Sequence, residues 1–472
     1  MNSKGKVRSL LLSTLLVLGA TGASAQAPPA QKQTPPPGGP PKAFKVPAHE
    51  TYTLPNGMRV TLVPYGNIPK LDISLSIRAG NLNDPRGVLG VADITGELLK
   101  EGTKTLSAKA LAETIAGMGS SLDLRVGEDE TAVDVDVLSE YGAPAIKLMA
   151  DFAMHPLLPE SELPRLKANL LRQVVVAKSR PGQIALARFR KLMYGDHPYG
   201  DVLPTEESLN KMTIEDARKF YADNYGAARA HLYVAGKFDV AEVKNAIAGT
   251  FSEWTKGTAP VVNAPKPKTQ RLLDVTDRPN APQSTIYVGL PVADATSTDN
   301  IPLIVTNSLL GGSFSSRITS NIREQKGYTY SPTSQVSRRY HDAYWAEIAD
   351  VTTAATGPSL KEIFGEIDRL QKEAPSTAEL KGIQSYLSGV FVIQNSTRQA
   401  LIGQLRYVDL QELGDEYLTT FVQKINAVTP EDVQKMTAKY IKPDQMTIVV
   451  VGDKSKITEQ LAPYASPAES TR

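Results

Sequence analysis

The chain reads Met212-Thr-Ile-Glu215-Asp216-Ala-Arg-Lys-Phe-Tyr221 and then Leu232-Tyr-Val-Ala-Gly236, and the same pattern returns as Val428-Thr-Pro-Glu431-Asp432-Val-Gln-Lys-Met-Thr437 and Ile448-Val-Val-Val-Gly452. One offset of 216 residues relates the two acidic pairs and also the two closing glycines. A chance match rarely keeps a single offset across two successive elements. The repeat therefore predicts two homologous halves.

Each copy of the repeat has the pattern of a helix followed by a strand. Thr213 and Thr429 can cap a helix N-terminus, and acidic residues follow them in the first turn, where the helix dipole favours negative charge. Each copy ends in a short apolar run, rich in β-branched residues in the second copy, that a glycine stops, which is typical of a buried strand.

Further strands and helices are predicted from apolar periodicity. Alternation predicts a hairpin at 52–63, around the Pro55-Asn-Gly57 turn, and strands at 71–78, 131–137, 284–290 and 344–350. Helical patterns cover 142–154, 161–179, 300–310, 359–373 and 378–395. Because the strands are joined by hairpins rather than in strict β-α-β alternation, we expect an α+β fold. Each of the two homologous domains should hold a mostly antiparallel sheet packed with helices.

The length of 472 residues is too great for one hydrophobic core. We expect an N-terminal domain at 49–254 and a C-terminal domain at 272–465. A linker at 255–271, which breaks all periodicity, joins them, and a short tail follows at 466–472.

The start of the chain has the features of an export signal. Three basic residues precede an apolar run at 10–18 and an Ala23-Ser-Ala25 cleavage site, so 1–25 is predicted to be a signal peptide. The Pro-rich segment at 26–48 is predicted to be an extended tether. We therefore expect a periplasmic protein.

Composition excludes several function classes. Removal of the signal peptide leaves 49 basic against 50 acidic residues, which gives no reason to expect a nucleic-acid partner. No later apolar run has the length of a membrane span. The chain has no cysteine, which excludes disulfides, thiolate metal sites and a cysteine nucleophile.

One segment has the frame of a zinc-peptidase helix, Gly90-Val-Ala-Asp93-Ile-Thr-Gly96-Glu97-Leu-Leu-Lys-Glu-Gly102-Thr103. An H-x-x-E-H helix binds zinc through two imidazoles four residues apart and uses the glutamate as general base. In this chain those three positions hold Asp93, Gly96 and Glu97.

The chain resembles the pitrilysin/insulinase family of zinc peptidases over nearly its whole length after the tether. Besides the duplicated layout, the motifs that carry this resemblance are Leu54-Pro-Asn-Gly57-Met-Arg-Val, Tyr194-Gly-Asp-His197-Pro-Tyr199-Gly200, Gly311-Gly-Ser-Phe-Ser-Ser-Arg317 and Arg323-Glu-Gln-Lys-Gly-Tyr-Thr-Tyr330. The family implies a third zinc ligand, a glutamate 75 to 80 residues after the motif, but the segment 172–178 contains no carboxylate.

The zinc chemistry is therefore expected to be absent from this chain. None of its five histidines lies three or four residues from another, so no helix presents two imidazoles on one face. We expect no catalytic residue and no bound metal in cis. Asp93 and Glu97 share a helix face, and this pair is either a site for a hard cation or a solvated or partner-facing acidic pair.

The second half keeps residues that the resemblance implies are functional. In the family an arginine and a tyrosine seven residues apart bind the backbone carbonyl of the substrate, and Arg323 and Tyr330 match that spacing. Gly311 and Gly312 match a glycine-rich loop that borders the substrate chamber. The alternative is that Arg323 pairs with a surface carboxylate while Tyr328 and Tyr330 alternate along a strand.

Three functions are compatible with these features. The leading expectation is a zinc-free, non-catalytic subunit that forms a heterodimer or larger complex with a zinc-bearing homologue and binds peptide substrate. The second is a peptide-binding or structural assembly protein with no role in hydrolysis. The third is a stand-alone metallopeptidase with a rearranged site.

Overall fold

The computed structural model describes residues 45–465. The predicted signal peptide at 1–25, residues 26–44 of the predicted tether and the predicted tail at 466–472 lie outside the described residues. Residues 45–49 have no regular secondary structure. Among the helices of residues 45–465, none is both long and apolar enough to cross a membrane.

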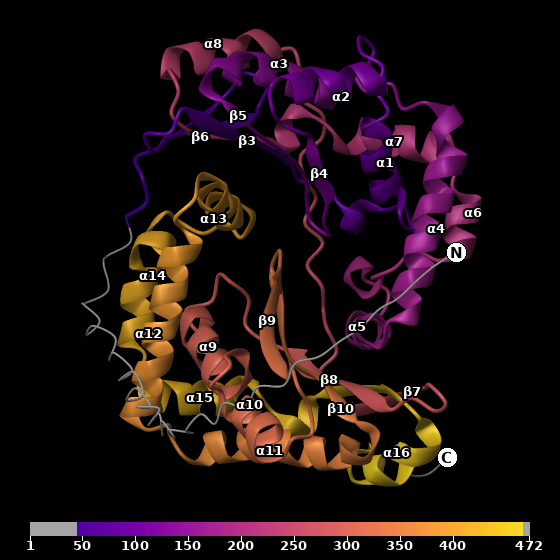
Figure 1. Ribbon diagram of the computed structural model, residues 1–472, viewed down its shortest axis with the longest axis vertical. Helices are drawn as coiled ribbons and strands as arrows, with labels where there is room; N and C mark the ends of the chain where they lie inside the picture. The colour runs from indigo at the N-terminus through magenta and orange to yellow at the C-terminus, as the bar shows by residue number, and fades with distance from the viewer. Residues whose placement is uncertain (1–44, 466–472) are drawn as a thin grey trace, which may run out of the picture. The chain divides into compact units, whose positions relative to one another are not determined.

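Two sheets organise the structure (Figure 1). In order of pairing, the first contains β1 (Glu50–Thr53), β2 (Arg59–Pro64), β6 (Ala230–Gly236), β3 (Lys70–Ile77), β5 (Thr131–Leu138) and β4 (Asp123–Val126). The second contains β7 (Leu272–Asp277), β11 (Thr447–Gly452), β8 (Gln283–Pro291), β10 (Asp342–Thr352) and β9 (Thr333–Arg339).

Helices surround both sheets (Figure 1). The first half has α1 (Val91–Leu99), α2 (Ala108–Gly117), α3 (Gly142–Met154), α4 (Leu163–Ser179), α5 (Pro181–Tyr194), α6 (Glu206–Lys211), α7 (Ile214–Asn224) and α8 (Val240–Phe251). The second half has α9 (Asn300–Asn307), α10 (Arg317–Thr319), α11 (Thr356–Lys372), α12 (Thr377–Gln394), α13 (Arg398–Leu410), α14 (Glu416–Ala427), α15 (Pro430–Tyr440) and α16 (Lys454–Leu461).

The two sheets share one pairing pattern. β6 lies between parallel β2 and antiparallel β3, and β11 lies between parallel β7 and antiparallel β8. The other strand pairs are antiparallel. The closing strand of each sequence repeat therefore holds the same place in its sheet, which confirms the predicted duplicated α+β fold.

The repeated helices α7 and α15 begin with the same cap. The Thr213 hydroxyl accepts a hydrogen bond from the Asp216 N–H at 3.3 Å, and the Asp216 carboxylate accepts one from the Thr213 N–H at 2.7 Å. Thr429 and Asp432 form the same reciprocal pair at 3.1 and 3.0 Å. Because these bonds satisfy N–H groups that a helix start leaves unpaired, both helices begin where the sequence predicts.

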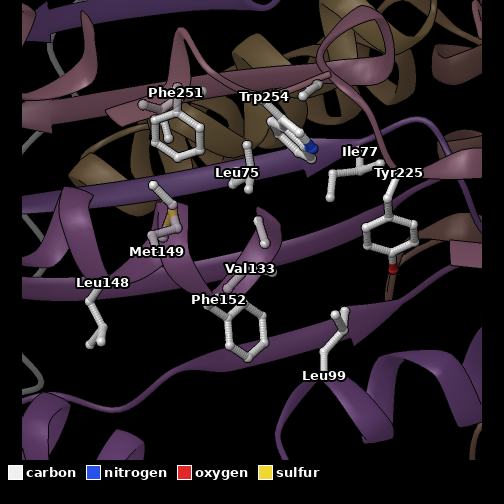
Figure 2. Close-up of a cluster of buried hydrophobic side chains, with 14 of the residues drawn as sticks. Leu75, Ile77, Leu99, Val133, Leu148, Met149, Phe152, Tyr225, Phe251 and Trp254 are labelled. Carbon is white, nitrogen blue, oxygen red and sulfur yellow. The ribbon is translucent and has the colours of Figure 1, made fainter. Parts of the chain in front are cut away.

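The core of the first half lies between its sheet and helices α3 and α8. Figure 2 shows Leu75 and Val133 of the sheet together with Met149 and Phe152 of α3 and Phe251 at the end of α8. All five side chains are buried, so the alternating residues of β3 and β5 face the helices as predicted.

Each half also lends one helix to the other half's sheet. Phe189 of α5 packs on the second sheet, with its ring centre 4.7 Å from that of Tyr287 and 5.3 Å from that of Tyr344. Leu405 of α13 is buried in a cluster with Val63 and Tyr233 of the first sheet. Phe189 and Leu405 are 216 residues apart, so the exchanged helices are themselves equivalent in the repeat.

An acidic turn joins the two halves. The turn between β4 and β5 carries Glu128, whose carboxylate binds Arg190 of α5 and Arg339 of β9. Glu130 binds Arg406 of α13. Between these glutamates, the Asp129 carboxylate accepts a hydrogen bond from the backbone N–H of Tyr340, in the equivalent turn of the second sheet, at 3.2 Å.

Two of the predicted helices end or begin at other residues in the structure than the sequence predicts. The helix expected at 161–179 begins with a 3₁₀ turn at Glu160–Glu162, and α4 starts at Leu163 because Pro164 suits only the first turn. The helix expected at 300–310 ends as α9 at Asn307 and continues as a π-helical turn at Ser308–Gly312. Residues 255–271 contain no helix or strand, as expected of the linker. The exact domain bounds stay a prediction.

The packing of the exchanged helices α5 and α13 predicts that replacing one buried side chain on either helix destabilises the fold. Phe189→Ala should lower the free energy of unfolding by about 3–5 kcal/mol and Leu405→Ala by about 2–5 kcal/mol, because each removes a buried side chain and leaves a cavity. Leu157→Ala, at a side chain that is 51% exposed, should change it by less than about 0.5 kcal/mol. Denaturant-induced unfolding measures all three, and a Phe189→Ala loss no larger than that of Leu157→Ala would contradict the packing.

Candidate functional site

The degenerate zinc motif lies on α1, and its two carboxylates have different partners. The Asn81 side-chain amide donates to the Asp93 carboxylate at 2.8 Å. Burial raises the pKa of Asp93 to about 6, and the neighbouring Glu97 charge adds to this effect. Glu97 is exposed and pairs with Lys100 at 2.6 Å. The two carboxylates therefore do not converge on one point.

Gly96, at the position of the family's general base, is enclosed by strand β4. A Cβ atom there would lie 2.6 Å from Cγ2 of Val126 and 2.9 Å from Cδ2 of Leu124. Both distances are shorter than van der Waals contact between carbon atoms allows. The space that a catalytic glutamate would need is therefore filled by the sheet, so the loss of the motif is built into the packing.

No alternative metal cluster takes its place. Among the side chains of residues 45–465, no group of three or more His, Asp or Glu could hold a metal ion. The five histidines lie apart, and each has its own partner. The pairs are His49 with Asp415, His155 with Asp151, His197 with the Asn263 carbonyl, His231 with Asp409, and His341 with Glu412. Over residues 45–465, this arrangement fits a chain that binds no zinc.

The helix that would supply the third ligand presents cations and valines instead. Residues 172–178 lie on α4, where Val175 is 60% exposed and Val176 50% exposed. Arg172 contacts only the side-chain amide of Asn169. No carboxylate lies on this stretch of α4 to complete a metal site.

Arg323 and Tyr330 are brought together, as the resemblance implies. The Cζ atom of Arg323 lies 5.0 Å from the ring centre of Tyr330 and 4.4 Å from that of Phe314. Both rings are largely exposed, at 79% and 70%. A guanidinium that contacts two aromatic rings is oriented by cation–π attraction, so its N–H groups are presented in a fixed plane.

The backbone after Arg323 sets this arrangement. Gly327 has a φ of +65°, and the following Tyr328 N–H donates to the Ile322 carbonyl at 2.9 Å. Thr329 then forms an isolated bridge with Val351 at the end of β10. Tyr328 consequently packs on the core while Tyr330 faces outward.

The alternative expectation, that Arg323 pairs with a surface carboxylate while Tyr328 and Tyr330 alternate along a strand, is met only in part. Tyr328 and Tyr330 do face opposite sides, but residues 328–330 form only an isolated bridge at Thr329 and not the strand of that alternative. Arg323 does have a carboxylate nearby, since its Nε lies 3.3 Å from Oε1 of the adjacent, exposed Glu324. A surface pair of this kind contributes about 0–1 kcal/mol and leaves the arginine available to a ligand.

Gly311 and Gly312 form a tight turn against β9 and β10. A Cβ atom on Gly311 would lie 2.5 Å from a carboxyl oxygen of Glu347 and 2.6 Å from Oγ of Ser334. One on Gly312 would collide with the Asn307 side chain. Close approach, rather than an unusual φ, therefore requires both glycines.

Beneath this turn lies a buried acid that the sequence did not single out. Glu347 is fully buried, and neither of its carboxyl oxygens has a hydrogen-bond partner in the described part of the chain. Burial raises the pKa of the Glu347 carboxyl well above its usual range, because an apolar interior disfavours the charged form. The sequence signal that could have indicated this buried acid is a single charged residue within the apolar run 343–349.

Phe314 was also missed as a contributor to the site. It lies in the quoted Gly311–Arg317 motif, but nothing in the sequence shows that its ring meets Arg323, nine residues later. An aromatic residue among glycines and serines was the signal. In the quoted Tyr194–Gly200 motif, His197 Nδ1 accepts a hydrogen bond from the Tyr199 N–H at 3.2 Å.

Comparison with known proteins places this geometry in context. The family model described as "Insulinase (Peptidase family M16)" matches residues 62–205, and the one described as "Peptidase M16 inactive domain" matches residues 211–387. Similar relatives include the "Uncharacterized zinc protease YmxG" of Bacillus subtilis, which is 26% identical over 83% of this chain and 96% of its own length. A non-peptidase homolog, YmxG, of Helicobacter pylori is 21% identical over 82% and 90%.

Solved structures share the fold. The M16 inactive domain from Pseudomonas fluorescens matches with a TM-score of 0.80 and 24% identity, over 86% of this chain and 98% of that one. A protease from Helicobacter pylori matches with a TM-score of 0.80 and 20% identity, over 86% and 100%.

The packing around Gly96 predicts that an added methyl group destabilises the fold at this glycine but not at a glycine that faces open space. Gly96→Ala should lower the free energy of unfolding by about 1–3 kcal/mol, because the new Cβ forces Val126 or Leu124 aside. Gly249→Ala, within α8 and facing open space, should be neutral or stabilise by up to about 1 kcal/mol through helix propensity. Thermal and denaturant-induced unfolding of both variants measure this difference. If Gly96→Ala were as stable as Gly249→Ala, the close contact of Gly96 with β4 would be contradicted.

Proposed function

The chain belongs to the insulinase (M16) family as a non-catalytic homologue, and we propose that it is the zinc-free subunit of a heteromeric periplasmic peptidase. A homologue with an intact H-x-x-E-H helix would supply zinc, water and the general base. This chain would supply Arg323 and Tyr330 to the bound peptide.

The placement of Arg323 carries this proposal. Its guanidinium is held between two exposed rings, and its only carboxylate neighbour among residues 45–465 is an exposed residue next to it in sequence. A cationic donor of this kind stabilises an oxygen that gains negative charge during peptide hydrolysis. Because residues 45–465 contain no cluster of side chains that could hold a metal and so activate water, we propose that the donor acts in hydrolysis beside a partner that has one.

An extended peptide fits the free edge of the first sheet. Strand β4 pairs only with β5 among the described strands, and the side chains of its Leu124 and Val126 lie against Gly96 of α1, which carries the degenerate motif. A peptide that adds to such an edge gains main-chain hydrogen bonds without demanding a particular sequence. Binding at β4 would bring a substrate near α1, the helix that carries the degenerate zinc motif.

Co-purification tests the heteromeric assembly. The full chain, recovered with a tag from the cell envelope of its native host, should bring with it a homologue that contains H-x-x-E-H and zinc. Recovery of the chain only as a monomer or homodimer would contradict the proposal, and so would stoichiometric zinc bound to this chain alone. A complex that contains the homologue but cleaves no peptide would favour a structural assembly role.

Replacement of Arg323 tests the substrate contact. Arg323→Ala should leave the complex intact but lower its kcat/KM for peptide by at least about tenfold, since the loss of one such donor typically costs about 10² to 10³ in rate. Lys361→Ala removes an exposed cation of α11 that forms no ion pair in the described part of the chain, and should leave kcat/KM unchanged. Size-exclusion chromatography checks assembly, and an Arg323→Ala complex with full turnover would refute the assignment.

A further inference from the structure

A small, strongly basic cavity lies where the ends of β2, β3 and β6 meet α13. Its volume is about 170 Å³. Pockets for organic ligands of drug size usually measure about 300–1,000 Å³, so this cavity suits an ion or a single functional group. The charged side chains that line it are Arg59, Arg78, Glu130, Arg229, Arg406 and Asp409, together with His231.

The two carboxylates of the cavity are already engaged. Asp409 receives hydrogen bonds from Arg59 at 3.0 Å, from the buried His231 and from the Tyr233 hydroxyl. Although burial raises the pKa of Asp409, these donors outweigh it and hold the pKa at about 2. Glu130 is bound by Arg406 and by the Ser76 hydroxyl. With both acids used, the four arginines leave two positive charges in excess.

The two positive charges without a carboxylate partner belong to Arg78 and Arg229. Neither forms an ion pair with a carboxylate of residues 45–465. Arg229 is only 7% exposed and donates to backbone carbonyls alone, including that of Arg78 at 2.8 Å. Burial lowers the pKa of Arg229, and the positive charge of Arg78 lowers it further. Two neighbouring cations that repel each other at a partly buried site are stabilised by any anion that lies between them.

Arg406 adds an unused donor from the other half of the chain. Although its terminal nitrogens contact Glu130 and Asp134, its Nε is buried and has no acceptor among residues 45–465. Buried N–H groups of charged side chains are seldom left without a partner, because the unmade bond costs about 1–3 kcal/mol.

We infer that this cavity is a binding site for a small oxyanion, held by Arg78 and Arg229 of the first half and Arg406 of the second. Guanidinium groups bind phosphate and carboxylate in preference to spherical anions, because paired N–H groups match paired oxygens. The anion is either a free phosphate or a carboxylate carried by a peptide. The site is separate from Arg323 and does not depend on the proposed peptidase role.

Binding by the whole protein tests this site. At constant ionic strength, adjusted with sodium chloride, sodium phosphate should raise the melting temperature of the full chain, and isothermal titration calorimetry should give a saturable signal. Sodium acetate and a short peptide with a free C-terminus distinguish the sources: tighter binding of the peptide assigns the site to a peptide carboxylate, and tighter binding of phosphate assigns it to the free ion.

Two arginine variants localise the effect. Arg78→Gln removes a cavity cation that has no ion pair to lose, and should weaken anion binding by at least tenfold without loss of the fold. Arg172→Gln replaces an exposed arginine of α4 that does not line the cavity and forms no ion pair within residues 45–465, and this variant should bind the anion as the unaltered protein does. No anion effect beyond that of chloride, or equal binding by Arg78→Gln and the unaltered protein, would overturn the inference.

Discussion

The acidic turn Glu128-Asp129-Glu130 is the contact on which the relation between the two halves depends. Arg190 of α5 and Arg339 of β9 share Glu128, and Arg406 of α13 binds Glu130. Both arginines are almost fully buried, whereas the Glu128 side chain is 38% exposed, so solvent screening keeps the cost of removing one partner below the roughly 3–5 kcal/mol of a fully buried pair. The exchanged helices α5 and α13 add apolar contact on either side of this turn. The ion pairs fix orientation, and the buried rings and aliphatic side chains supply most of the free energy.

Duplication explains why these contacts come in pairs. Arg190 and Arg406 occupy equivalent repeat positions, and each reaches a carboxylate of the same turn. The equivalent turn of the second sheet carries Arg339 and Tyr340 rather than acids, so the two turns are complementary. Divergence between the halves thus created an interface that a pair of identical copies would not have, because like charges would have met there.

The same divergence separates the lost chemistry from the retained chemistry. In the first half, Leu124 and Val126 fill the place of a catalytic side chain at Gly96, so packing has replaced the site. In the second half, the turn after Arg323 still directs Tyr330 outward and holds the arginine between two rings. A fold maintained only for its core has no reason to expose Phe314 and Tyr330 beside a cation, since exposed aromatic groups gain nothing from the hydrophobic effect.

The sequence by itself determined the duplicated α+β fold, the caps of α7 and α15, and the absence of zinc ligands, because each depends on residue type at short, regular spacing. It also placed Arg323 and Tyr330 through a motif seven residues apart. Tertiary structure alone decided the exchange of α5 and α13, the contact of Phe314 with Arg323, the burial of Glu347 and the cavity between Arg78, Arg229 and Arg406. Those features join residues from separate elements, up to more than 300 positions apart in the case of Arg78 and Arg406. No local periodicity records which face of one element meets another, so only the packing of the whole chain sets them.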